Sequence, residues 1–211
     1  MKIINVMASS VDSFIAAKPI ESDEERQQIK ISSKEDYEYL LETMKDADAI
    51  IVGASSIRAN GECLELTDST NPHWYILAQS ELEADMHFWK QDKIKRTVVS
   101  TNTLPIYNES VNSMFFTGLS SLDMTAELME HLKKQNFKKV LLFGGGEVNS
   151  WFYELSYVDE LALTLAPVIV ASESGSNFVN PKLSQPVPLS LLDVKQKAGF
   201  LFLRYQVSKD R

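Results

Sequence analysis

The chain has 211 residues, 44% of them hydrophobic, which is enough to bury the core of one domain. Its formal net charge of −8 opposes binding to a nucleic-acid backbone, and its single cysteine, Cys63, excludes an internal disulfide and fits a reducing cytoplasm. No apolar run reaches the roughly 18 residues of a membrane-spanning helix. We therefore expect a soluble, cytoplasmic protein of one domain, residues 1–211, that binds a small molecule and neither nucleic acid nor membrane.

The first quarter of the chain predicts a strand, a loop and a helix. Residues 2–8 are apolar and β-branched at the outset, which is typical of a buried strand. Residues 17–32 are polar and acidic, so we expect a solvated loop there. Ser32 and Glu35 have the spacing of a capping box, and apolar residues then recur at helical intervals up to Met44, which indicates a helix.

The middle of the chain continues with strands and helices in alternation. A buried strand at 49–53 ends in a glycine and is followed by a polar turn. Further strands, indicated by apolar and β-branched residues, are expected at 74–78, 96–100, 113–117 and 139–143. Apolar residues at helical spacing predict helices at 123–135 and 146–156.

The last quarter has a different pattern. "DELALTLAPVIV" predicts a long buried strand that ends at Pro167, and apolar runs at 189–196 and 200–208 flank Ala198-Gly199 as a hairpin. Strands that alternate with helices and are followed by a hairpin indicate an α/β fold. We expect a three-layer α/β/α arrangement with a mostly parallel central sheet and an antiparallel C-terminal hairpin.

Three consecutive glycines stand between a predicted strand and a predicted helix, in "VLLFGGGEVNSWF" at residues 140–152. Glycine lets another molecule approach the backbone closely, and the start of a helix offers unpaired amides and a positive dipole end, which together favour an anion such as a phosphate. A tight turn without a ligand is the other interpretation, because the segment matches neither the full dinucleotide fingerprint nor the Walker pattern.

Two other loops favour the ligand. "ASSVDS" follows the first strand and "GASSIR" follows the strand at 49–53, and both are rich in small residues and hydroxyl groups. In a parallel sheet, ligands bind beyond the carboxyl ends of the strands, where these loops and the glycines should meet. The three loops together predict a nucleotide site.

The same segments resemble the reductase domain of the bifunctional riboflavin-biosynthesis deaminase-reductase family, which shares the dihydrofolate reductase fold. "MASSVDSFIA" is similar to the family's A-x-S-L-D-G segment, "ADAIIVGASSIRA" to its A-D-A-I-x-V-G-x-x-T-x-x-A segment, and "FGGGEVNSWFYELSYVDELALTLAPVIV" to its glycine loop, helix and following strand. The resemblance implies an NADPH-dependent reductase. It places the cofactor pyrophosphate on Gly144, Gly145, Gly146 and the amides of Glu147 and Val148, other parts of NADPH on Gly53, Ser55 and Ser56, and the nicotinamide carboxamide against Ala8.

Some positions depart from the family's pattern. Phe143 and Asn60 stand where the family's riboflavin enzymes commonly carry acids implicated in holding the substrate, and Ser13 replaces a glycine. We also expect no deaminase domain before the reductase. The resemblance implies hydride transfer to a small heterocyclic or sugar-linked substrate, nearest to the 5-amino-6-(5-phosphoribosylamino)uracil reductase step. A dihydrofolate-type reductase and a non-catalytic nucleotide-binding protein are the alternatives.

Four polar residues are candidates for the substrate end of the site. Asp12 follows the first strand and could orient a ring or relay a proton as the catalytic residue, or it could cap the turn. Ser10 could bind substrate or satisfy backbone in that turn. Arg58 could pair with a phosphate or with a surface carboxylate, and Asn60 replaces the family's acid.

The sequence gives weaker signals for the adenosine end of the cofactor site, for metals and for partner proteins. Ser100 and Thr101 end a strand and could contact the adenosine 2′-phosphate, but no arginine stands beside them, so NADPH over NADH rests on the resemblance. The three histidines lack metal-ligand spacing, so we expect no metal. The aromatic residues at 151–157 predict core packing first and a homodimer surface second.

Overall fold

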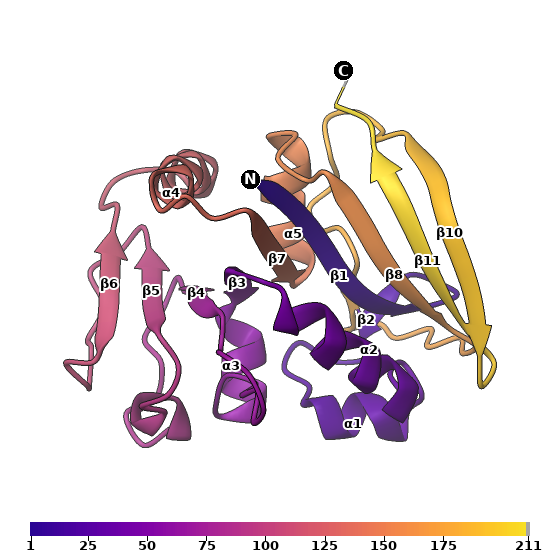
Figure 1. Ribbon diagram of the computed structural model, residues 1–211, viewed down its shortest axis with the longest axis horizontal. Helices are drawn as coiled ribbons and strands as arrows, with labels where there is room; N and C mark the ends of the chain where they lie inside the picture. Colours follow the sequence, from indigo (N-terminus) through magenta and orange to yellow (C-terminus); the bar gives the residue numbers. More distant parts are fainter. Residues whose placement is uncertain (210–211) are drawn as a thin grey trace.

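The computed structural model describes residues 1–209, and its centre is a nine-stranded sheet (Figure 1). Its parallel strands run in the order β8 (Glu160–Ala166), β1 (Lys2–Ser10), β7 (Lys139–Gly144), β3 (Ala49–Gly53), β4 (His73–Leu77), β5 (Arg96–Ser100) and β6 (Val111–Phe115). Beyond β8 the sheet ends in an antiparallel hairpin, β11 (Phe200–Val207) and β10 (Leu189–Lys197). The predicted mostly parallel sheet with an antiparallel C-terminal hairpin is confirmed.

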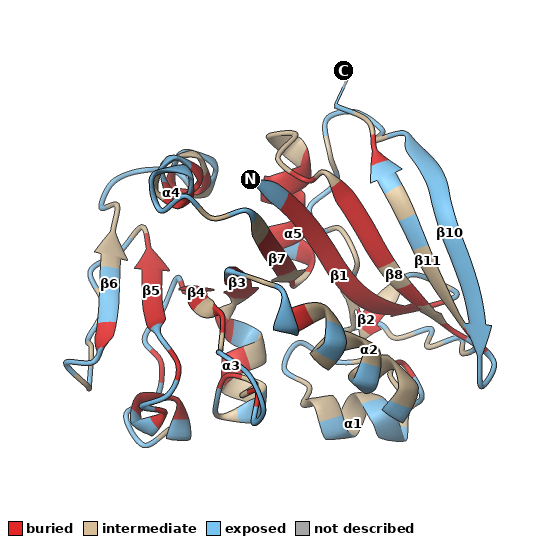
Figure 2. Ribbon diagram, viewed as in Figure 1, coloured by how far each residue is buried: buried red, intermediate tan, exposed pale blue. Residues whose placement is uncertain are grey.

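Helices cover both faces of this sheet. Side chains alternate along a strand, so Ile50 and Ile51 of β3 enter different apolar clusters on opposite faces. Ile50 packs in the cluster that contains Met44 of α2 (Lys34–Lys45) and Ile57 of α3 (Ala54–Asn60). Ile51 packs in the cluster that holds the buried residues of α4 (Ser121–Lys134) and α5 (Gly146–Glu154). Buried residues accordingly fill the central strands in Figure 2.

Two predictions about local structure were wrong. The polar turn expected after residue 53 is α3, and the solvated loop expected at 17–32 contains α1 (Asp23–Gln28). Both helices are short and α1 buries no side chain, so neither carries a long apolar period. The capping box lies at Ser22 and Glu25 of α1, whereas α2 is capped by Ser33, one residue after the position that spacing indicated.

Other predicted elements differ only at their ends. The strand predicted at 113–117 is β6, two residues earlier, and the long strand of the last quarter stops at Ala166. The C-terminal hairpin turns at Ala198 and Gly199, both with positive φ, as a two-residue turn of type I′ requires. A 3₁₀ turn, η1 (His87–Lys90), and a small sheet of β2 (Phe14–Ala16) and β9 (Ser176–Asn177) complete the elements.

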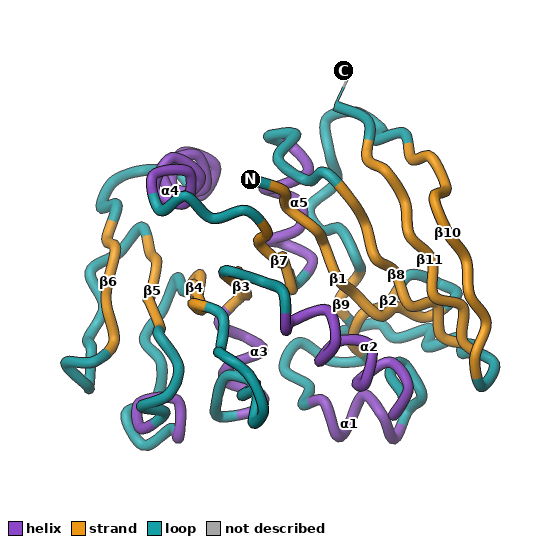
Figure 3. Tube along the Cα trace, in the orientation of Figure 1, coloured by secondary structure: helices purple, strands orange, loops and turns teal. Residues whose placement is uncertain are grey.

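The sheet order brings the three predicted loops together. β1, β7 and β3 are neighbours and parallel, so the chain leaves all three at the same edge of the sheet (Figure 3). A β-carbon built on Gly53 would lie 3.2 Å from the carbonyl oxygen of Gly144, which shows how closely two of these loops approach. Among the described residues, none of the helices has the length and apolar character needed to cross a membrane.

Candidate functional site

The loop after β7 has a backbone that glycine accommodates. Gly144 and Gly145 have φ angles of +61° and +80°, which L side chains rarely adopt. A β-carbon on Gly144 would lie 2.2 Å from the side-chain oxygen of Asn149, whereas nothing lies within 4 Å of one built on Gly145. Close packing therefore requires the first glycine, and the second borders open space.

Helix α5 begins directly after this loop, and no side chain caps it. Gly145 is its N-cap residue, so the N–H groups of the first turn receive no hydrogen bond acceptor from a capping side chain. Gly146, Glu147 and Val148 form that first turn and line a cleft. Uncapped amides and the positive end of the helix dipole make this point suited to an anion such as a phosphate.

A buried polar network supports the loop from below. Asn5 Nδ2 donates to the carbonyl oxygen of Leu142 at 2.8 Å and to Asn149 Oδ1 at 3.1 Å, and Tyr153 Oη donates to Asn5 Oδ1 at 3.1 Å. Asn149 Nδ2 in turn donates to the carbonyl oxygen of Phe178 at 2.8 Å. These bonds join β1, the end of β7, α5 and the segment after β9, so they fix where the glycines lie.

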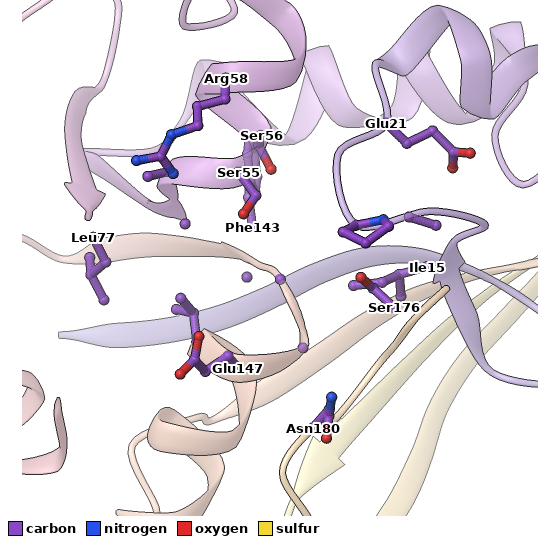
Figure 4. Close-up of a pocket in the computed structure, with 18 of the residues that line it drawn as sticks. Ile15, Glu21, Ser55, Ser56, Arg58, Leu77, Phe143, Glu147, Ser176 and Asn180 are labelled. Atoms are coloured by element: carbon purple, nitrogen blue, oxygen red, sulfur yellow. The ribbon is translucent and has the colours of Figure 1, made fainter. Parts of the chain in front are cut away.

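The glycine-loop cleft, of about 540 Å³, lies at the carboxyl ends of β3 and β7. Figure 4 shows Ser55 and Ser56 on one side of it and Glu147 on the other. Among the residues predicted from the sequence, the cleft is lined by Gly53, Ser55, Ser56, Arg58, Asn60, Gly144, Gly145, Gly146, Glu147 and Val148. The structure therefore brings the predicted pyrophosphate loop and the loop after β3 to one cleft.

A second cleft, the α1–α2 cleft of about 420 Å³, adjoins the first. Ala8 lines it, as do several residues that also line the glycine-loop cleft, namely Met7, Asp23, Arg26, Ser56, Asn60 and Phe143. Helices α1 and α2 supply much of its remaining wall. Shared walls make the two clefts neighbouring compartments, with Met7 and Phe143 at the junction.

Asp12 lies outside both linings. Its carboxylate accepts hydrogen bonds from the Ser10 hydroxyl at 2.6 Å and from the amides of Val170 and Ala171 at 3.1 and 2.8 Å. These bonds hold the pKa of Asp12 at about 2, the Ser10 hydroxyl contributing most, although partial burial opposes the shift. Ser10 Oγ also accepts the amide of Phe14 at 2.9 Å. The geometry favours the turn-stabilising role for both residues, and the catalytic role of Asp12 stays a prediction.

Arg58 lines the glycine-loop cleft but is engaged with protein groups. Its Nη2 donates to the carbonyl oxygens of Ser80 and Glu81, both at 3.0 Å, and to Ser80 Oγ at 2.8 Å. The Arg58 Nε lies 4.0 Å from a carboxylate oxygen of Glu83. These contacts brace α3 against the segment after β4, and the pairing with Glu83 favours the surface-carboxylate alternative for this arginine.

The candidates for the adenosine end are set back from the cleft. Ser100 is fully buried, and its hydroxyl accepts the amide of Asn102 at 2.9 Å. Thr101 Oγ1 donates to Gln79 Oε1 at 2.7 Å, and Gln79 lines the glycine-loop cleft. Thr101 thus reaches the cleft through Gln79, and neither candidate is part of its lining.

Sequence reasoning missed the residues that α1 brings to the site. Arg26 and Asp23 line both clefts, and Glu24 and Gln27 line the α1–α2 cleft. The capping box of Ser22 and Glu25 was the signal that could have revealed this helix. Trp74, at the start of β4, was placed in a strand, but its place in the wall of the α1–α2 cleft follows only from the fold.

Known structures show the same fold. A pyrimidine reductase-like protein from Corynebacterium diphtheriae superposes with a TM-score of 0.82 at 18% identity, over 99% of this chain and 92% of that one. A diaminohydroxyphosphoribosylaminopyrimidine deaminase/5-amino-6-(5-phosphoribosylamino)uracil reductase from Thermotoga maritima gives 0.75 at 18% identity, over 97% of this chain and 56% of that longer one.

The likeness extends to dihydrofolate reductase. The Enterococcus faecalis enzyme, complexed with NADP(H), superposes with a TM-score of 0.57 at 14% identity, over 99% of this chain and 97% of that one. The dihydrofolate reductase-like fold is thereby confirmed. A family model described as the RibD C-terminal domain matches residues 1–198. The chain therefore belongs to the RibD C-terminal domain family, the reductase family of riboflavin biosynthesis.

Proposed function

We propose that the protein is an NADPH-dependent reductase that transfers hydride to a small heterocyclic or sugar-linked substrate, nearest in kind to 5-amino-6-(5-phosphoribosylamino)uracil. The observation that carries this proposal is the uncapped first turn of α5, which lines a cleft beside the glycine loop and the loop after β3. Family membership supports the reaction class. NADPH supplies the hydride when it is bound.

The residues of the glycine-loop cleft fit a dinucleotide. Its pyrophosphate would lie on Gly144, Gly145 and Gly146 and accept hydrogen bonds from the amides of Glu147 and Val148. The open space at Gly145 supports this assignment, because nothing within 4 Å fills the place of a side chain there. Gly53, Ser55 and Ser56 form the facing wall, where small side chains leave room for the cofactor.

The cofactor and the substrate are assigned to different clefts in this proposal. The nicotinamide would lie near Ala8, which lines the α1–α2 cleft, and the substrate ring would lie in that cleft. Asn60 lines both compartments, but its amide Nδ2 donates to the Ser56 carbonyl oxygen at 3.1 Å, and its Oδ1 accepts the amide of Asp23 at 3.0 Å. Asn60 therefore positions the start of α1 beside the α1–α2 cleft.

NADPH titration and an absorbance assay test the proposal. The chain should bind NADPH. The absorbance of NADPH at 340 nm should then fall when 5-amino-6-(5-phosphoribosylamino)uracil or its unphosphorylated ribosyl form is added. NADH is titrated in parallel, because Arg58 donates to Ser80 and Glu81, and Thr101 to Gln79, so both candidates for a 2′-phosphate already bond to protein groups. Dihydrofolate is the third substrate. Oxidation of NADPH by dihydrofolate alone identifies the dihydrofolate-type reductase, and tight NADPH binding without any oxidation identifies the non-catalytic protein.

A further inference from the structure

The α1–α2 cleft has a predominantly negative lining. Among the described residues, its charged lining groups are the cation of Arg26 and the carboxylates of Asp23, Glu24, Asp36 and Glu62. The charge of Arg26 is partly offset, because its Nη1 lies 3.6 Å from the carboxylate of Asp23. The pKa of Tyr37, in the same lining, is raised by burial and further by the charges of Asp23 and Glu62.

Two side chains that line the same cleft each carry a buried hydrogen bond donor that lacks a partner. Among the described residues, Arg26 Nε and Trp74 Nε1 are the two buried side-chain nitrogen or oxygen atoms without a hydrogen bond. Both side chains line the α1–α2 cleft, and Trp74 is only 3% exposed. A buried donor without a partner destabilises the protein, so native structures pair nearly all of them, with ligands and water as well as with protein groups.

We propose that the substrate of the reductase is a hydrogen-bond-accepting heterocycle that carries no phosphate group. Its ring accepts hydrogen bonds from Arg26 Nε and Trp74 Nε1, and the carboxylates around it reject a phosphorylated form. This inference rests on the proposed function, because it assigns the α1–α2 cleft to the substrate, and it deepens that function by naming the substrate class.

Charge balance decides against the phosphate ester. A phosphate monoester carries nearly two negative charges at neutral pH, and like charges placed together across a binding surface disfavour the wrong ligand. A substrate phosphate usually meets several lysines or arginines, whereas the cleft offers Arg26 alone, already beside Asp23. The anion site at the first turn of α5 lines the other cleft, where the cofactor pyrophosphate would occupy it.

Binding of two ligands that differ only in the phosphate tests the charge argument. The full chain is loaded with NADP⁺, so that no turnover occurs, and is titrated by calorimetry with 5-amino-6-ribosylaminouracil and with its 5′-phosphate. At low ionic strength the unphosphorylated compound should bind at least about tenfold more tightly. Added salt should shrink the ratio, because it screens the carboxylates. Equal or tighter binding of the phosphate ester overturns the proposal, as does binding of neither compound.

Single charge changes in the cleft wall should reduce this discrimination. Glu62→Gln removes one carboxylate at the exposed edge of the cleft and should lower the ratio about threefold at low salt. Glu127→Gln is the matched control, since it removes one exposed carboxylate from α4, on the opposite face of the sheet, and should leave the ratio unchanged. Equal effects of the two changes would assign the discrimination to net charge and overturn the role of the cleft.

Trp74→Phe tests the donor argument separately from the charge argument. The change keeps an aromatic ring and removes an N–H group that has no partner in the free protein, together with part of a ring packed in the core, so the melting temperature should fall only by the cost of the smaller ring and the Kd is measured well below it. The Kd of 5-amino-6-ribosylaminouracil should rise about tenfold. An unchanged Kd for the folded variant overturns the assignment of Trp74.

Failure of the proposed function would be visible elsewhere. If NADP⁺ does not bind, the titration with cofactor alone reveals it, and the two ligands are then compared on the cofactor-free chain, where the same ratio decides. If both ligands bind in the expected order but neither oxidises NADPH, the proposed ligand class is supported and the proposed reductase activity is refuted.

Discussion

The carboxylate of Asp12 accepts the backbone N–H of Ala171 at 2.8 Å and so ties the turn after β1 to the segment after β8. β1 and β8 are parallel neighbours, and the amide of Val170 adds a second bond to the same carboxylate at 3.1 Å. Both amide contacts therefore hold one loop to another, while the hydrogen bond from the Ser10 hydroxyl to the same carboxylate lies within the turn. These hydrogen bonds give Asp12 a role in the stability of the two loops.

Asp12→Asn separates these roles. Because the pKa of Asp12 is lowered from 3.8 to about 2, ionisation stabilises the fold above pH 3.8, and this stabilisation is lost as the pH falls towards 2. The variant should melt a few degrees lower at pH 7, and the difference from the wild type should vanish as the pH approaches 2. Thermal melts across this range measure it. A fall in turnover of about 100-fold with an unchanged melting temperature would instead establish the catalytic role.

Gly145→Asp should weaken NADPH binding more than tenfold, about 1.4 kcal/mol, because it places a carboxylate beside the pyrophosphate. Gly145→Ala is the matched control. Both variants force a side chain onto a residue with φ of +80°, and the β-carbon of neither meets an atom within 4 Å, so they share the backbone strain and differ in the carboxylate. Fluorescence titration with NADPH gives both dissociation constants. Equal constants for the two variants would refute phosphate binding at this loop.

Asn149→Leu should lower the free energy of unfolding by about 2–4 kcal/mol, because it removes one of the two acceptors of the buried Asn5 amide and leaves the Phe178 carbonyl oxygen without the Asn149 donor. It should also raise the Kd of NADPH, since Asn149 packs against Gly144. Asn112→Leu, on the exposed part of the edge strand β6, is the control and should stay within about 0.5 kcal/mol. Urea denaturation measures both. A smaller loss of unfolding free energy in Asn149→Leu would mean that water molecules replace the missing hydrogen bonds.

The homodimer anticipated from the sequence has its best support in β10 rather than in the aromatic residues of α5, most of which are buried. Leu191 and Leu192 are 56% and 52% exposed on this strand. If a second copy covers them, Leu191→Lys should convert a dimer to a monomer in sedimentation velocity. Leu122→Lys on α4, where the leucine is 38% exposed, should leave the dimer intact. A monomeric wild type at micromolar concentration would rule this surface out as a dimer contact.

The sequence predicted the sheet and the small-residue loops that follow its central strands because these depend on short-range signals. Apolar runs such as 49–53 form strands, and glycines after a strand mark a close approach, so the convergence of Gly53 and Gly144 followed from parallel order alone. The substrate side could not be predicted equally well. Arg26 lies on a helix that buries no side chain, so no apolar period marks it, and the orphaned donor of Trp74 depends on packing between distant segments.

The aspartate after β1 illustrates the same limit. Its position at the end of a buried strand indicated a residue facing a ligand, but the partner amides at 170 and 171 lie far away in the chain. Whether a polar side chain meets a ligand or another loop depends on which loops pack beside it, and the sequence around Asp12 does not contain that information.

Helix α1 lines the α1–α2 cleft, carries its own capping box and buries none of its side chains. The glycine loop and the loop after β3, in contrast, follow strands at the centre of the sheet. Substitutions at the residues by which α1 lines the cleft therefore alter the cleft wall without opening a cavity in the hydrophobic core. The chemistry of one wall is in this way separable from the packing that holds the sheet together.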